Sequence, residues 1–341
     1  MLGHMTTSPI FIVGCPRSGT TLLRNLLRSH PRLTFPSESH FIPLFYRAYG
    51  HPRTEQDAVA LAKRMLGLQW VCQWNVSITP QEFAGLDRTF QTVIGRLFEA
   101  WARKEGKPRW GDKTPHYVEE IPVLAELFPA GRIIHIIRDG RDVALSWLKA
   151  GFEPRNLYTA AMLWQRYVSA GCRDGARLPP ATYLEVRYEA LVDQPETTMR
   201  KVCAFVDEPF TEAVLHPSPI RGILRPKIIG GGVPEVAAKL ERIAPSAVDW
   251  TVEMPPVDRL LFESIAGDLL EILGYEVSGA RRSISAGERL AWGLHHQLWW
   301  VIERLNTKGS HRWLLAHLEL RRAAARARAR QVAAPGSSPS T

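Results

Sequence analysis

The stretch Ile10-Phe-Ile-Val-Gly-Cys-Pro-Arg-Ser-Gly-Thr-Thr-Leu-Leu23 decides the fold of this chain. Its first four residues form an apolar run, as in a buried strand. A loop of glycine, proline and serine follows, and an amphipathic helix is predicted to start near Gly19. A strand, a tight loop and a helix start together make an anion cradle, because backbone N–H groups and the positive end of the helix dipole point into the loop.

The spacing of this loop is close to that of a nucleoside-triphosphate-binding loop, G-x-x-x-x-G-K-[ST]. Gly14 and Gly19 have the required separation, but Thr20 stands where that motif has lysine. A cation appears three residues earlier instead, at Arg17. Without the lysine, the loop is poorly suited to a β- or γ-phosphate with magnesium. The sequence therefore predicts a different anion, bound by Arg17 and by the hydroxyls of Thr20 and Thr21.

Apolar strand segments alternate with amphipathic helices along the rest of the chain. Further strands are predicted at 33–36, 132–137 and 182–186. Helices are predicted near 19–30 and over 56–66, 91–104, 117–128, 140–150, 157–175, 196–206 and 255–273. This alternation predicts an α/β fold, a P-loop-containing parallel sheet flanked by helices, with a C-terminal helical extension. The predicted divisions are a domain over 1–280, a basic tryptophan-containing helical extension over 281–330 and a disordered tail over 331–341.

The loop sequence PRSGTT resembles the 5′-phosphosulfate loop of sulfotransferases that use 3′-phosphoadenosine 5′-phosphosulfate (PAPS). Arginine at position 17 is similar to the tyrosylprotein and bacterial branches, whereas the cytosolic members usually carry lysine there. The resemblance implies that the whole loop binds the cofactor, namely Pro16, Arg17, Ser18, Gly19, Thr20 and Thr21. Leu22 departs from the cytosolic enzymes, which have an adenine-stacking tryptophan at this position, so the stacking partner must differ.

A second element, Arg138-Asp-Gly-Arg-Asp-Val-Ala-Leu-Ser146-Trp, follows a predicted strand. Ligands of open α/β sheets bind beyond the carboxyl ends of the strands. The element resembles the 3′-phosphate motif of the sulfotransferases, which implies that Arg138 and Ser146 bind that phosphate. The alternative is an ordinary helix start, where Asp139 and Asp142 favour the positive dipole end. Arg138 and Arg141 would then be solvated.

Two more elements follow the family's order. Trp110-Gly-Asp-Lys-Thr-Pro115 resembles the KTP element, whose lysine reaches the sulfuryl group or its bridging oxygen, and this role falls to Lys113. Val186-Arg-Tyr-Glu-Ala-Leu-Val-Asp-Gln-Pro195 resembles the RYEDL-x-x-x-P element, whose tyrosine lies close to the adenine. That role falls to Tyr188, and Ala190 stands where aspartate is usual.

A later glycine-rich loop is placed like the late 3′-phosphate loop of the family. Its cations Arg225 and Lys227 are the cofactor ligands implied there, on a looser match. With this loop, the resemblance covers most of the chain to about residue 275.

The resemblance implies a PAPS-dependent sulfotransferase that needs no metal, with Glu38, Lys113 and Arg17 as catalytic residues. Such an enzyme must position the acceptor, remove its proton and stabilise charge on the leaving oxygen. Glu38 follows the second predicted strand. If that strand runs parallel to the first, its carboxyl end lies beside the loop at 14–21, and Glu38 is the candidate base. His40 is the competitor, because a neutral imidazole suits this task near pH 7.

The amino-acid composition limits the classes of protein to which this chain can belong. The chain has 341 residues, of which 45% are hydrophobic and 23% charged, as in soluble globular proteins. The four cysteines are scattered without a C-x-x-C pair, which argues against a disulfide scaffold and a zinc site. The start of the chain has no apolar segment long enough for a signal peptide or membrane anchor. A cytoplasmic location is therefore expected, in a bacterium.

The net charge of +9 is concentrated at one end. Residues 281–330 hold eleven Arg or Lys and three acids, a net charge of +8. They also hold the tryptophans Trp292, Trp299, Trp300 and Trp313. Tryptophans beside a basic face suit an anionic membrane surface, so peripheral contact with the inner membrane face is one hypothesis. The other is a pair of helices packed on the body with a solvated basic end, which is favoured for the first helix.

The sequence does not identify the acceptor, and a small molecule, a lipid or a glycan is expected. Nucleic acid is not an expected partner. Two rival functions remain, a P-loop nucleotide kinase or NTPase and a catalytically silent binding protein. Thr20 in place of lysine disfavours the first rival, and the presence of Glu38 and Lys113 favours an enzyme over the second.

Overall fold

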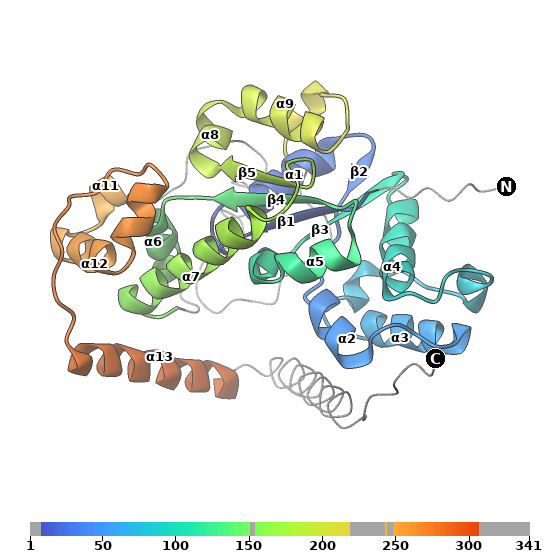
Figure 1. Ribbon diagram of the computed structural model, residues 1–341, viewed down its shortest axis with the longest axis horizontal. Helices are drawn as coiled ribbons and strands as arrows, with labels where there is room; N and C mark the ends of the chain where they lie inside the picture. Colours follow the sequence, from blue (N-terminus) through green and yellow to red (C-terminus); the bar gives the residue numbers. More distant parts are fainter. Residues whose placement is uncertain (1–7, 151–153, 219–242, 244–247, 307–341) are drawn as a thin grey trace, which may run out of the picture.

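The computed structural model describes residues 8–150, 154–218, 243 and 248–306. The centre of this part is a five-stranded sheet in the order β2-β3-β1-β4-β5 (Figure 1). The strands are β1 (Ile10–Gly14), β2 (Leu33–Thr34), β3 (Arg109–Lys113), β4 (Arg132–Ile137) and β5 (Tyr183–Arg187). Every neighbouring pair is parallel, so the carboxyl ends of all strands meet at one edge. The predicted α/β parallel sheet is confirmed.

Helices cover both faces of this sheet (Figure 1). One face carries α1 (Thr20–Ser29), α8 (Tyr188–Asp193) and α9 (Pro195–Phe205). The other carries α4 (Phe90–Lys104), α5 (Ile121–Leu127), α6 (Gly140–Ala150) and α7 (Leu157–Gly175). Around this second layer lie α2 (Ile42–Tyr49), α3 (Glu55–Leu66), α11 (Trp250–Glu253), α12 (Pro256–Ile272) and α13 (Ala286–Asn306). Short 3₁₀ turns are η1 (Cys72–Trp74), η2 (Pro80–Phe83), η3 (Pro115–Glu119) and η4 (Glu212–Leu215).

Alternation along β1 divides the apolar interior into two layers. Ile10 and Ile12 pack with the leucines of α1, whereas Phe11 and Val13 face α4, α5 and α7. This two-residue period is that of a strand buried on both faces. The sheet is therefore held from both sides, and only its edge of strand ends is left for a polar site.

One strand of the sheet was not predicted. The segment Arg109–Lys113 is rich in charge and lacks an apolar run, yet it forms β3 and lies fully buried between β2 and β1. The second strand is therefore parallel to the first but not beside it. The expectation that the end of β2 lies beside the 14–21 loop is wrong, because β3 lies between β2 and β1.

Two helical predictions also change. The helix expected over 117–128 is divided into η3 and α5, because Pro122 sits at the start of a new helix. The helix α2, which has a proline near its start, was not predicted. The helices predicted at 56–66, 91–104, 140–150, 157–175 and 196–206 match α3, α4, α6, α7 and α9 to within one residue at each end.

The C-terminal part is described only to residue 306. The helix α13 begins the predicted extension, and the division of the chain at residue 280 stays a prediction. The residues Arg225 and Lys227, the second predicted helix of the extension and the tail at 331–341 lie outside the described residues. In the part that is described, no helix combines the length and hydropathy needed to cross a membrane.

Candidate active site

The loop after β1 turns sharply through two left-handed residues, Arg17 at φ 74° and Gly19 at φ 90°. A Cβ atom at Gly19 would overlap the ring of Tyr188, so only glycine fits there. The Ser18 side chain is fully buried and lies beside the Cys15 thiol, with which it forms a side-chain hydrogen bond. The helix α1 starts directly after this loop without a side-chain cap. Its first N–H groups are therefore available to an anion.

The two predicted phosphate motifs meet beyond the ends of β1 and β4. Gly14 and Ile136 are partners in the sheet, so the loops that follow them are adjacent. Arg17 Nε donates to Ser146 Oγ at 3.0 Å, and Arg138 donates to the carbonyl oxygen of Arg17 at 3.4 Å. Residues separated by more than 120 positions thus form one cationic cluster.

Arg138 is enclosed rather than solvated. Its guanidinium lies 4.5 Å from the centre of the Tyr188 ring and forms a salt bridge with Asp142 at 3.0 Å. Trp164 Nε1 donates to the Arg138 carbonyl oxygen at 3.0 Å. Arg138 Nε is buried and has no hydrogen-bond partner in the described part of the chain. The alternative interpretation, an ordinary helix start with a solvated arginine, is therefore wrong for Arg138.

The same alternative is wrong for Arg141, which sequence reasoning did not select. Its side chain is 1% exposed and forms salt bridges with Asp139 at 2.7 Å and Glu263 at 2.8 Å. Its guanidinium lies 3.5 Å from the ring centre of Trp250. Glu189 accepts a hydrogen bond from the Asp139 backbone at 2.9 Å. Arg141 thus anchors the turn that carries Arg138, and its partner in α12 is too distant in sequence to be inferred.

The predicted base and the KTP lysine form an ion pair. Lys113 Nζ, at the end of β3, contacts Glu38 Oε1 and lies 3.4 Å from Thr21 Oγ1. The other carboxylate oxygen of Glu38 lies 2.8 Å from His40 Nε2. The Lys113 side chain is 3% exposed and that of Glu38 33% exposed. Both candidate bases and the lysine therefore form one chain of contacts that ends at the anion-binding loop.

Buried hydrogen bonds fix the backbone between the two candidate bases. Ser39 Oγ bonds to Asp112 at 2.7 Å and lies 2.9 Å from the Tyr117 hydroxyl. The Ser39 N–H donates to Thr114 Oγ1 at 3.1 Å. His40 itself takes a left-handed backbone conformation, with φ 54°. The side chains of Asp112, Thr114 and Tyr117 thus hold the backbone of this turn in place.

The local charges set the ionisation of this cluster. Burial raises the pKa of Glu38, but Lys113 and His40 outweigh it and hold that pKa well below 4.5. Burial lowers the pKa of Lys113 below 10.5, and the charge of Glu38 opposes this only in part. Burial raises the pKa of Asp112 to about 6. Glu38 is consequently a carboxylate at neutral pH, the form that a base requires.

A second polar cluster lies at β4, β5 and α7. His135, Cys172 and Glu185 offer nitrogen, sulfur and oxygen atoms within 4.8 Å of one another, although the scattered cysteines had argued against such a grouping. The Tyr183 hydroxyl lies among them, 2.7 Å from His135 Nδ1 and 3.0 Å from Glu185 Oε1. Because the hydroxyl already contacts the nitrogen and the oxygen of this cluster, we propose no metal here.

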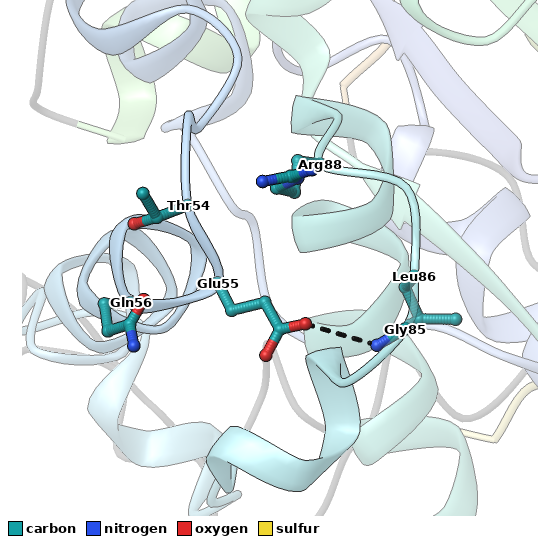
Figure 2. A pocket seen from close by; sticks show the side chains of 6 residues that line it. All are labelled: Thr54, Glu55, Gln56, Gly85, Leu86 and Arg88. Carbon is teal, nitrogen blue, oxygen red and sulfur yellow. Dashed lines mark hydrogen bonds between the residues drawn. The ribbon is translucent and has the colours of Figure 1, made fainter.

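A surface pocket of about 500 Å³ lies between the start of α3 and the loop before α4 (Figure 2). It is lined by Thr54, Glu55, Gln56, Gly85, Leu86 and Arg88. Glu55 Oε1 accepts a hydrogen bond from the Gly85 N–H at 3.3 Å across it. No predicted site residue lines this pocket, so the candidate active site lies elsewhere, at the edge of the strand ends.

A parallel sheet with an anion-binding loop after its first strand defines a P-loop-containing α/β protein. The profile of the sulfotransferase family matches residues 9–212, which is more than half of the chain. The chain therefore belongs to the sulfotransferase family, a family of enzymes. This confirms the resemblance that the sequence elements from PRSGTT to RYEALVDQP predicted.

Curated relatives include protein-tyrosine sulfotransferases. The chain is 29% identical over 217 residues to the protein-tyrosine sulfotransferase of Drosophila melanogaster, covering 61% of this chain and 39% of the relative. It is 29% identical over 228 residues to protein-tyrosine sulfotransferase A of Caenorhabditis elegans, covering 63% of this chain and 54% of the relative. The chain thus spans about half the length, or less, of these two relatives.

Solved structures show the same fold. The sulfotransferase domain from the curacin biosynthetic pathway superposes with a TM-score of 0.53 at 24% identity, over 79% of this chain and 98% of that domain. The sulfotransferase domain from the Synechococcus PCC 7002 olefin synthase superposes with a TM-score of 0.53 at 23% identity, over 80% of this chain and 97% of that domain. This similarity supports the fold and leaves the acceptor open.

Proposed function

We propose that this chain transfers a sulfuryl group from PAPS to a hydroxyl or amine of its acceptor. The observation that carries the proposal is the ion pair of Lys113 and Glu38 beside Thr21 of the anion-binding loop. A cation for the leaving oxygen and a carboxylate for the acceptor proton are the two charges that this displacement needs.

The donor requires anion-binding groups at two places. The loop from Pro16 to Thr21 is proposed to hold the sulfate end, and Arg138 with Ser146 the 3′-phosphate. Arg138 Nε supports this, since it is buried without a partner in the described residues and could bond to phosphate oxygens. Three fixed cations, Arg17, Lys113 and Arg138, supply the countercharge, so we propose that no metal is needed.

The adenine is proposed to lie near Tyr188. The ring of Tyr188 lies against Gly19 on one side and beneath the guanidinium of Arg138 on another. An aromatic ring between the two phosphate motifs suits the base of a nucleotide whose phosphates occupy both. Arg225 and Lys227 stay proposed as further 3′-phosphate ligands.

Glu38 is the proposed base. When bound, PAPS supplies an activated sulfuryl group and a nucleotide that departs with the bridging oxygen. Glu38 takes the proton of the acceptor as the acceptor oxygen or nitrogen bonds to sulfur, and Lys113 and Arg17 stabilise the charge on the bridging oxygen. His40 is the alternative base, but its contact with the loop runs through Glu38.

The acceptor is proposed to be a small molecule, a lipid or a glycan rather than nucleic acid. The names of the two curated relatives add a tyrosine phenol of a protein to these candidates. We also propose a cytoplasmic location.

Two experiments test this function. Calorimetry with 3′-phosphoadenosine 5′-phosphate in the presence of EDTA should show binding without metal. Tight binding of ATP with magnesium, and none of the 3′-phosphorylated nucleotide, would favour a kinase or NTPase instead. Incubation of the purified protein with PAPS, first with a cell extract and then with a tyrosine-containing peptide, should yield sulfated products by mass spectrometry. No sulfated product in either mixture, with binding intact, would favour a catalytically silent binding protein.

A further inference from the structure

The helix α13 packs on the body of the protein by one side. Trp292 stacks on Tyr158 of α7 with ring centres 5.1 Å apart, and Asn156 Nδ2 donates to the Trp292 carbonyl oxygen at 3.1 Å. The guanidinium of Arg155 lies 5.2 Å from the ring centre of Trp299. These contacts fix α13 against the start of α7, at the lower edge of the molecule in Figure 1.

The opposite side of α13 carries an apolar row, here called the outer stripe. The outer stripe consists of Leu290, Leu294, Leu298 and Val301, which are 64%, 60%, 59% and 45% exposed. At about 100° per residue, spacings of four, four and three residues place them on one face of the helix. Single exposed apolar residues are ordinary, but a continuous row on one helix marks an interaction surface.

The surroundings of the outer stripe are basic. Arg289 of α13 donates to the Ile284 carbonyl oxygen rather than to an acid. The sequence that follows the helix, residues 307–330, holds seven Arg or Lys and a single acid. An apolar helix face followed by a strongly cationic segment complements an anionic lipid surface.

We propose that the outer stripe of α13 docks on an anionic membrane surface, with residues 307–330 adding electrostatic attraction. The two contributions respond differently to salt. Insertion of leucine side chains is insensitive to salt, whereas attraction between charges is screened beyond a Debye length. The proposal is independent of the sulfotransferase activity, because vesicle binding is measured without donor or acceptor.

The test is co-sedimentation of the full-length protein with phosphatidylcholine vesicles, with and without phosphatidylglycerol, at low and high salt. The parent protein should bind the anionic vesicles more tightly, and less so at high salt. The double variant Leu294→Ser/Leu298→Ser should lower partitioning by about tenfold or more. The matched control is Val257→Ser/Ile272→Ser on α12, whose side chains are 66% and 80% exposed and lie outside the stripe. This control should bind like the parent.

The charge contribution is tested with the full chain in which the five arginines from 321 to 330 are replaced by glutamine. This variant should lose most of the salt dependence and keep the dependence on the stripe leucines.

Several results would overturn the proposal. One is equal binding of the parent to neutral and anionic vesicles, and another is an equal loss in the α12 control. A change of oligomeric state in the stripe variant, with vesicle binding unchanged, would assign the stripe to contact between copies of the chain. A large fall in its melting temperature would show that the stripe is covered within the chain.

Discussion

Lys113 and Glu38 form an ion pair that joins β3 to the turn after β2, and the lysine of this pair lies 3.4 Å from Thr21 Oγ1. Because β3 lies between β2 and β1, this pair is the contact through which the turn with Glu38 reaches the anion-binding loop. Glu38 also bonds to His40, so each of its carboxylate oxygens contacts a nitrogen. Each carboxylate oxygen has a second lone-pair site, so the carboxylate can take a proton from an acceptor while it keeps both contacts.

The first prediction concerns Glu38→Gln. The turnover number of this variant should fall by about 10²–10⁴-fold, because a positioned base contributes a rate factor of that size. Its affinity for 3′-phosphoadenosine 5′-phosphate should stay nearly intact, since Glu38 is not among the proposed nucleotide ligands. Steady-state kinetics and calorimetry measure the two quantities. Glu196→Gln, at a half-exposed ion pair with Arg200, is the control. Normal turnover in Glu38→Gln would transfer the base role to His40 or elsewhere.

The second prediction is the pH dependence of kcat/KM. Since the pKa of Glu38 in the folded protein lies well below 4.5, its carboxylate persists as the pH falls from neutrality and is lost only as the pH passes through that lowered value. Activity should therefore stay level on the acidic side until below pH 4.5. Buffer-matched kinetics of the parent test this. A loss of activity well above pH 4.5 that Glu38→Gln leaves unchanged would contradict Glu38 as the base.

Arg138→Ala should act first on the nucleotide. Loss of a charge-assisted bond to phosphate should weaken binding of 3′-phosphoadenosine 5′-phosphate by about tenfold to hundredfold. Arg200→Ala, whose side chain is 56% exposed, is the matched control and should bind normally. Calorimetry in EDTA gives both affinities. If Arg138→Ala binds the nucleotide like the parent, its assignment to the 3′-phosphate is wrong.

Gly19→Ala should disturb both the loop and the tyrosine beside it. A left-handed φ of 90° is strained for alanine, and the added Cβ would overlap the Tyr188 ring. The expected loss of stability is about 1–3 kcal/mol. The Gly19→Ala substitution should cost less stability when it is made in the Tyr188→Ala protein than in the parent, because the ring that the new Cβ would overlap is then absent. Urea unfolding of the four proteins tests this, and additive losses would contradict it.

Glu263→Ala tests the anchor of the turn that carries Arg138. It leaves the fully buried Arg141 with only Asp139 as a salt-bridge partner among the described residues, and breaking a buried pair costs about 3–5 kcal/mol. Nucleotide affinity should fall together with stability, because Arg141 fixes the turn that carries Arg138. The control is Asp268→Ala on the same helix, where the side chain is 91% exposed and the expected change is small. A Glu263→Ala protein that binds the nucleotide as tightly as the parent would contradict the anchor.

The sequence predicts those parts of the fold that are built from apolar runs. β1 and β4 are largely apolar strands, and the loops that follow them carry the proposed anion-binding residues, so the adjacency of these loops follows from a parallel sheet. β3 could not be found in this way. Its Arg109 pairs with Glu208, its Asp112 with Ser39 and its Lys113 with Glu38, and these partners make a charged segment compatible with the interior.

The residues proposed for the candidate site could be selected from the sequence, but their contacts could not. Glu38 is predicted from its place after the second strand. Its contact with Lys113 depends on β3, and no apolar pattern in the sequence predicts that strand. The burial of Arg141 depends on Glu263, which lies 122 positions later in the chain. Long-range pairing of this kind leaves no local periodicity, so no single-sequence pattern can indicate it.

The strand order has a consequence for how such an enzyme could be re-engineered. The proposed nucleotide ligands follow β1, β4 and β5, whereas Glu38 and the segment 41–108 lie with β2 and β3, on the other half of the sheet. A recombinant chimera that exchanges residues 41–108 with those of a relative would leave the donor-binding loops and the KTP lysine in place. The proposed nucleotide ligands and the proposed base thus lie on different halves of the sheet, so such a chimera tests whether residues 41–108 set the choice of acceptor.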